Sequence, residues 1–430
     1  MNTNKYFSLA WVAASMVLFA ACKKDYTNPN QPTTEEVFAN ERAATAVAGG
    51  LQRVYSLGAG GSLYATVDAN GFTTGELILR NAGNTGELQL STGGSAVDAT
   101  NTVLANIWTK SNKIIYDADN VIDFAATMQD GTYSSGMIGF ASIYKALSLG
   151  NLSMFWEMVP DTTGGNVGFV DRMEGFRKAM RVLDFGISSV TANAPNATVL
   201  RRLPTEVNII NTLYALKARY AIFSGDNAGA LAAANLVDLT KTSTIAHNAL
   251  GLNAVFESAT STNNVFQPVD STMGLPVDLA PDLNDQRVGF YIGINATIAP
   301  RYRIKGFYAA SSAPVPLYLP GEVMLIKAEA LARLDRLTEA VDALNAVRTK
   351  TPAQDIYGVG GGLTAFASTD KEEILTEIYR QRCIELFMFG LKLEDMRRFG
   401  RPATERKRNF FPYPFSERDN NPNTPADPAN

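Results

Sequence analysis

Apolar residues recur at helical spacing in two similar stretches of the chain. In the first stretch, Ile210, Tyr214 and Ala218 lie four residues apart, and a Gly-Asp-Asn turn at 225–227 leads to a second helix that ends near Asp238. An apolar face with this period is typical of an amphipathic helix. The pattern therefore predicts a helical hairpin over about 205–239.

The second stretch repeats the pattern. Val323, Ile326 and Ala330 define one helix, Leu334-Asp335-Arg336 forms the connection, and Leu337 begins the next helix. Both hairpins carry small residues where two helix backbones must approach closely: Ala215, Ala218, Ala221, Ala328, Ala330 and Ala332. Paired helices of this kind look like the tetratricopeptide repeat, whose unit of about 34 residues stacks into a superhelix.

We expect four helix pairs in all, irregularly spaced, near 139–189, 205–239, 320–350 and 371–400. Two stretches, 58–100 and 240–318, lose the helical period and are richer in Gly, Ser, Thr, Asn or Pro. Aromatic residues within them favour ordered, loop-rich insertions over disorder. Such insertions commonly build binding surfaces.

The N-terminal segment has the form of a secretory signal. A short lead with Lys5 precedes an apolar run from Tyr6 to Ala21 that is too brief for an ordinary membrane-spanning helix. The boundary Leu18-Phe19-Ala20-Ala21-Cys22 resembles a bacterial lipobox, in which the cysteine is acylated after cleavage. We therefore predict a signal peptide over 1–21, lipid attachment at Cys22, a polar tether over 22–34, and one folded domain over 35–430.

Composition excludes several classes of function. The formal net charge of −4 gives no strong field for nucleic acid. With only His247 and two cysteines, the chain cannot assemble a Cys/His zinc site or a three-histidine site. The glycine-rich runs at 58–61 and 358–362 lack the dinucleotide fingerprint and the Gly-Lys-Ser/Thr ending of a nucleotide loop. We expect no metal, no cofactor and no catalytic residue, a structural role for His247, and a buried core thiol at Cys383.

The C-terminal third resembles the SusD/RagB family. The helix over Glu372–Gly400 is similar to the family's Glu-Arg-x-x-Glu-Leu and Asp-Leu-x-Arg-x-Gly motifs, and Asn409–Pro414 is similar to its terminal Phe-Pro-Ile-Pro motif. Trp108–Asn120 is similar to a third family motif, further upstream. The chain departs from the family pattern at Gln381, Phe389 and Lys392.

This resemblance implies an all-α fold, in which tetratricopeptide-like pairs form a right-handed superhelix with loop-rich insertions. It implies a surface lipoprotein of the outer membrane that binds a glycan or another nutrient without enzymatic activity. The implied partner is a SusC-like TonB-dependent β-barrel transporter, which would import the captured ligand.

The ligand-binding residues do not follow from the motifs, because the family's contacts lie in variable loops. Aromatic platforms with polar neighbours can recognise sugars. The candidate residues are therefore aromatics and arginines of the two insertions: Tyr64, Phe72, Arg301, Tyr302, Arg303, Phe307 and Tyr308.

Two alternatives remain open. A superhelical groove could bind a protein or peptide as a scaffold. A lipoprotein glycosidase needs only two suitably spaced carboxylates, although the chain lacks the alternation of strands and helices that is typical of a barrel enzyme.

Overall fold

The computed structural model describes residues 33–429, which belong to two compact units with their boundary in the sequence between Ala43 and Ala44. In the first unit, α2 (Thr34–Phe38) begins with a capping box, in which Glu36 N donates to Thr33 Oγ1 and Thr33 N donates to Glu36 Oε2. Helix α3 (Glu41–Ser56) begins in this unit and ends in the second. The predicted signal peptide and the predicted lipid attachment at Cys22 lie outside the described residues.

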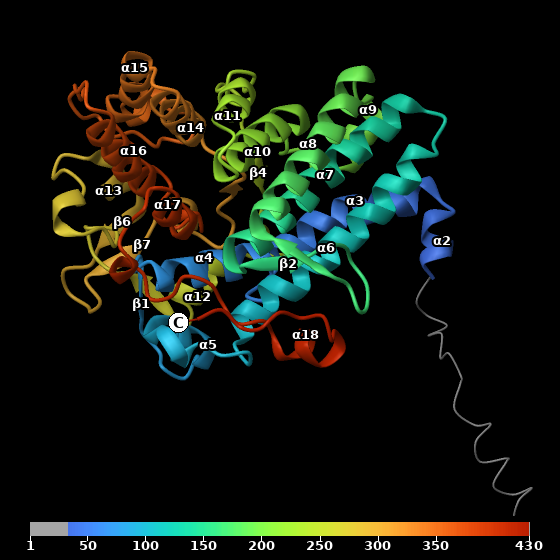
Figure 1. The fold of residues 1–430 in the computed structure, drawn as a ribbon, viewed down its shortest axis with the longest axis horizontal. Helices are drawn as coiled ribbons and strands as arrows, with labels where there is room; N and C mark the ends of the chain where they lie inside the picture. Colours follow the sequence, from blue (N-terminus) through green and yellow to red (C-terminus); the bar gives the residue numbers. More distant parts are fainter. Residues whose placement is uncertain (1–32, 430) are drawn as a thin grey trace, which may run out of the picture. The chain divides into compact units, whose positions relative to one another are not determined.

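Three long helices form one side of the second unit (Figure 1): α6 (Thr102–Ala126), α7 (Gly131–Phe155) and α8 (Arg172–Ala192). Asn101 and Asp130 cap the first two of these helices with side-chain hydrogen bonds. Helix α7 is buried almost all round because it packs against α6, α8 and α10.

The predicted hairpins follow as α10 (Ile209–Phe223) with α11 (Asn227–Ala234), and α14 (Pro320–Arg333) with α15 (Leu337–Arg348). Helices α16 (Lys371–Glu385) and α17 (Lys392–Arg398) come next. The alanines singled out in both hairpins are all buried. Leu325, Leu344 and Ile378 belong to one apolar core that α14, α15 and α16 share. Short side chains thus permit the close helix contacts that the sequence predicts.

Four further α-helices lie in the insertions: α4 (Ser62–Thr73), α5 (Thr85–Thr92), α12 (Ala254–Thr260) and α13 (Gln286–Tyr291). Helix α9 (Ala197–Arg202) lies between α8 and α10, and α18 (Phe415–Asn420) follows the last helix pair. The described strands form four two-stranded antiparallel sheets: β1 (Leu77–Leu79) with β5 (Phe266–Pro268), β2 (Met158–Pro160) with β3 (Phe169–Asp171), β4 (Thr244–Ile245) with β8 (Val315–Pro316), and β6 (Ile292–Ile294) with β7 (Tyr302–Ile304). No described helix is both long enough and apolar enough to cross a membrane.

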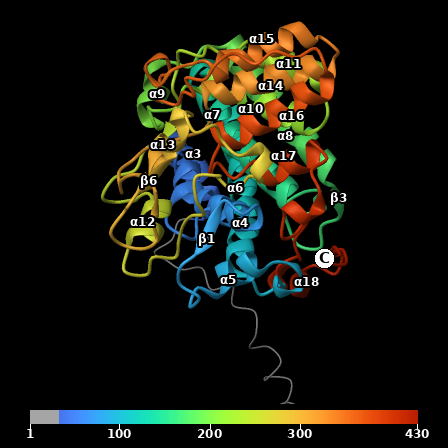
Figure 2. The same cartoon turned by 90° about the vertical axis from the view of Figure 1, so that its left-hand side faces the viewer.

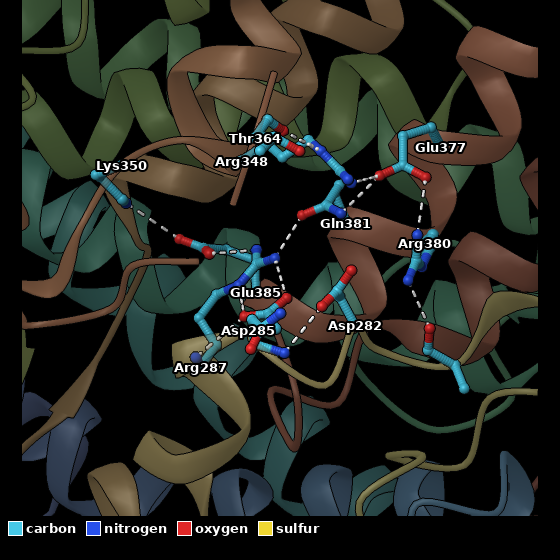
Figure 3. Close-up of polar contacts among 12 residues, drawn as sticks. Asp282, Asp285, Arg287, Arg348, Lys350, Thr364, Glu377, Arg380, Gln381 and Glu385 are labelled. Carbon is cyan, nitrogen blue, oxygen red and sulfur yellow. Dashed lines mark hydrogen bonds and ion pairs between the residues drawn. The ribbon is translucent and has the colours of Figure 1, made fainter. Parts of the chain in front are cut away.

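A buried ionic network fastens the later insertion to the helix pairs (Figure 3). Arg287 donates to both carboxylate oxygens of Asp285 (3.0 and 2.7 Å), to Glu385 (3.0 Å) and to the amide oxygen of Gln381. The side chains of Arg287, Asp285 and Glu385 are fully buried, and Lys350 approaches Glu385 from the end of α15. Burial alone would lower the pKa of Arg287, but its hydrogen bonds and the charges of Asp285 and Glu385 raise that pKa above its ordinary value. The network thereby fixes α13, in the later insertion, against α16.

Candidate functional site

The two insertions meet along the sheet that β1 and β5 form. Leu77 pairs with Pro268 and Leu79 pairs with Phe266, so segments nearly 190 residues apart in sequence run side by side. Figure 2 shows the early insertion in blue beside the later one in yellow. At the end of this sheet, Arg80 N donates to Val265 O at 2.8 Å. The turns that follow β1 and precede β5 therefore share one surface.

Three asparagines from these turns bond to one another, and we call them the asparagine cluster: Asn81, Asn84 and Asn263. Asn81 Nδ2 donates to Asn263 Oδ1 at 2.7 Å, and Asn263 Nδ2 donates to Asn84 Oδ1 at 3.0 Å. Asn263 is exposed, and the other two are partly exposed. Bonds among these turns already engage both N–H groups of Asn81 and of Asn84 and one of the two N–H groups of Asn263. The second N–H of Asn263 and the remaining lone pairs of the amide oxygens are left to bond the hydroxyls of a ligand.

Asn263 also lines a hollow of about 400 Å³. Ser258, Ser261 and Glu257 add polar groups to its lining. The lining also includes aliphatic residues, among them Leu250, which is 78% exposed and is held in place where Arg53 Nη2 donates to Leu250 O at 3.1 Å. A lining that combines polar and apolar groups suits a ligand with hydroxyls and CH faces.

Four of the candidate aromatics proposed from the sequence are buried. Tyr64 and Phe72 lie on α4 and contact the ring of Phe266 at centroid distances of 6.2 and 6.1 Å. Phe307 packs against Phe290, and Tyr308 Oη donates to Met388 O at 3.0 Å. In this conformation these rings hold the insertions against the core and present no face to a ligand.

The other three candidates remain accessible at the β6–β7 hairpin. Arg301 is exposed and its guanidinium lies over the ring of Tyr302, while Tyr302 and Arg303 are partly exposed. Arg303 Nη2 donates to Ile298 O at 3.2 Å. The hairpin is tied to β5 where Ile304 N donates to Gln267 Oε1 at 3.0 Å, so these residues flank the sheet that carries the asparagine cluster.

Sequence reasoning missed the asparagine cluster. Asn81 and Asn84 flank Ala82-Gly83, and Asn263 follows Ser261-Thr262. Both stretches are ordinary turn sequences. No local signal distinguishes a turn asparagine from one that faces a partner brought in by long-range strand pairing.

Asp68 lies buried on α4 in the early insertion. Neither of its carboxylate oxygens has a hydrogen-bond donor among the described residues. Burial, and secondarily the charge of Glu87, raises the pKa of Asp68 well above its ordinary value. The folded protein thus holds a proton on Asp68 at pH values where the unfolded chain, with a pKa of about 3.9, has lost it.

This difference predicts that the free energy of unfolding falls as the pH rises above about 4. Asp68→Asn removes the titrating group. The variant should exceed the parent in stability by about 1–3 kcal/mol at neutral to alkaline pH, and the difference should narrow toward about pH 4. Urea denaturation across this pH range measures both curves, and parallel curves would contradict the argument.

The described residues contain no cluster of three or more His, Cys, Asp or Glu side chains that could hold a metal ion. His247 is buried, and its Nδ1 lies 3.2 Å from Gly251 O. Desolvation lowers the pKa of this imidazole. Cys383 is buried and unpaired, as expected, and burial raises the pKa of its thiol to about 12. Neither side chain has the setting of a nucleophile.

Comparisons with known proteins find a family model and solved structures that resemble this chain. Residues 255–427 match the model of the SusD family. A SusD superfamily protein from Bacteroides vulgatus has a TM-score of 0.66 at 14% identity, over 92% of this chain and 98% of the other. One from Bacteroides thetaiotaomicron has a TM-score of 0.65 at 15% identity, over 92% and 100%. Among curated proteins, none matches this sequence significantly.

The resemblance to the SusD/RagB family is thereby confirmed. The predicted fold class is confirmed as well: the chain has a mostly helical, SusD-like fold with tetratricopeptide-like pairs. A further structure, described as a laminarin-binding SusD-like protein, has a TM-score of 0.60 at 16% identity, over 90% of this chain and 98% of the other.

Proposed function

We propose that this protein captures a glycan at the surface where its two insertions meet. The observation that carries the proposal is the asparagine cluster beside a hollow lined by both polar and aliphatic residues. Amide groups and the hydroxyls of Ser258 and Ser261 match sugar hydroxyls, while Leu250 offers apolar contact to CH groups. The SusD-like fold and the similarity to a laminarin-binding SusD-like protein support the same class of ligand.

We further propose that the protein is a lipoprotein anchored at Cys22 to the outer membrane and exposed at the cell surface. The lipobox Leu18–Cys22 supports this location. Its partner would be a SusC-like TonB-dependent β-barrel, to which the captured nutrient passes. The activity would be binding alone, with the ligand released intact.

A peptide-binding scaffold is the second candidate function. A hollow of about 680 Å³ lies near α9 and the start of α10, and its wall is largely apolar, with Leu200, Leu203 and Ile209 among its residues. Apolar grooves in repeat proteins commonly receive protein segments. Any set of ligands tested for binding should therefore include peptides as well as glycans.

Asn263→Ala tests the proposed glycan site. Asn263 bonds to both other members of the cluster and lines the hollow, so its loss should weaken glycan binding about fivefold to tenfold. Calorimetric titration of the soluble form, residues 26–430, measures the change. Asn235→Ala, an exposed asparagine at the end of α11, is the matched control and should bind as the parent does. If both variants bound the glycan with equal affinity, the asparagine cluster would not be part of the binding site.

A further inference from the structure

Two adjoining hollows follow one face of α6 and share no lining residue with the hollow beside the asparagine cluster. Thr109, Asn112, Tyr116 and Asp119 recur every three or four residues, so they share this face of the helix. The first hollow, of about 300 Å³, is closed by the loop after Pro160 and by the start of α18. The second, of about 200 Å³, continues along α6 and shares Asn112 and the same loop. Together they form one elongated depression.

The first hollow combines an aromatic surface with hydroxyl and amide groups. Tyr116 is 50% exposed within it, and Thr109 and Thr162 contribute exposed hydroxyls. Trp108 lines the hollow and donates its Nε1–H to Glu417 Oε2 at 3.0 Å, which directs the carboxylate toward the same space. An exposed ring with polar groups around it suits the CH face and the hydroxyls of a pyranose.

The second hollow is charged, but most of its charges are paired. Lys145 pairs with Asp119, and Lys178 pairs with Asp161. Arg181, the remaining cation of the lining, pairs at 2.6 Å with Glu174, a carboxylate that Arg177 also contacts. Little excess charge is therefore left to select an anionic or cationic ligand. Paired carboxylates and ammonium groups still accept and donate hydrogen bonds, so a neutral polyhydroxylated chain fits best.

The wall opposite α6 is held in place by hydrogen bonds. Asp161 N donates to Gly168 O at 2.8 Å across the base of the β2–β3 loop. Asn421 Nδ2 donates to Val167 O at 3.1 Å, and Asn423 Nδ2 donates to Asn166 O at 3.0 Å, so the segment after α18 braces the loop. A preformed wall lowers the entropic cost of binding.

We propose that these hollows form a second carbohydrate-binding site, which takes a neutral oligosaccharide with one sugar ring against Tyr116. The proposal rests on the proposed function, because it extends glycan capture to a second surface. It assigns Tyr116 the stacking role and Glu417, Asn112 and the threonines the hydroxyl contacts.

Intrinsic fluorescence separates this site from the asparagine cluster. The soluble form, residues 26–430, retains two tryptophans, Trp108 and Trp156, whose rings contact at a centroid distance of 4.8 Å. Neither insertion contains a tryptophan. A sugar that bonds to Glu417 changes the environment of Trp108, whereas a sugar at the asparagine cluster gives calorimetric heat without this signal.

The experiment titrates the soluble form with the neutral hexasaccharides laminarihexaose, maltohexaose and xylohexaose, with fluorescence and calorimetry in parallel. We expect a saturable fluorescence change with at least one of them. Tyr116→Ala should weaken that response about tenfold, while Tyr116→Phe keeps the ring and the response. Phe185→Ala is the matched control, because Phe185 is a similarly exposed ring (48%) on α8 that lies outside the hollows.

Heat without any fluorescence change at saturation would overturn the second site and leave the proposed function intact. A fluorescence response that Tyr116→Ala leaves unchanged would equally overturn it. Neither heat nor fluorescence change with any of the three sugars would count against both proposals.

Discussion

Replacing Arg287 with methionine should lower the free energy of unfolding by about 3–5 kcal/mol. The guanidinium compensates two fully buried carboxylates, Asp285 and Glu385, and it also bonds to Gln381. Methionine fills a similar volume but supplies no charge and no donor. The two carboxylates would then remain buried, and among the described residues the cation left in an ion pair with them is Lys350, 3.4 Å from Glu385 and already paired with Asp355 at 2.6 Å. Urea denaturation of the soluble form, followed by circular dichroism, measures the loss.

An exposed ion pair provides the control for this prediction. Arg336 pairs with Glu339 at 2.5 Å on the surface of α15, and both side chains are about half exposed. Water screens such a pair, so Arg336→Met should leave the denaturation midpoint unchanged. If both variants lost the same stability, the buried network would not be what fastens the later insertion to α16.

Replacing Cys22 with alanine should move the full-length protein from the membrane fraction to the soluble fraction. Two or three acyl chains bind a bilayer firmly, since each buried methylene contributes about 0.8 kcal/mol. Fractionation of a bacterial host that acylates lipoproteins, followed by immunoblotting of membrane and supernatant, measures the shift.

The second cysteine is the matched control for the anchor. Cys383 is buried on α16, and burial raises the pKa of its thiol. This thiol should therefore undergo neither acylation nor thiol–disulfide exchange. Cys383→Ala should therefore stay in the membrane fraction. Persistence of Cys22→Ala in that fraction would contradict the lipobox assignment.

The helical body was predictable because its signals are local. Periodic apolar residues and the buried alanines, such as Ala218 and Ala330, define helices and close contacts within short stretches of sequence. The surroundings of the insertions were not predictable, because the pairing of β1 with β5 joins distant segments. Rings such as Tyr64 and Phe307 looked like ligand platforms in the sequence, yet that pairing and the core cover them.

The departures from the family motifs now have structural roles. Gln381 accepts from Arg287 and donates to Glu377, which links the network without adding a charge. Phe389 packs against Phe307 at a centroid distance of 5.6 Å. Lys392 donates to Gly274 O at 2.8 Å, so its ammonium braces the later insertion through a backbone carbonyl. The motif region Glu372–Gly400, expected as one helix, is in fact divided into α16 and α17, and each of these three side chains connects it to the later insertion.

The most direct test of glycan capture is calorimetric titration of residues 26–430 against polysaccharides, oligosaccharides and peptides, with product analysis of each mixture. We expect saturable binding to at least one glycan, which is recovered intact. Breakdown of the glycan would contradict a function of binding alone. Saturable binding to peptides, with no binding to glycans, would contradict glycan capture and favour the peptide-binding scaffold.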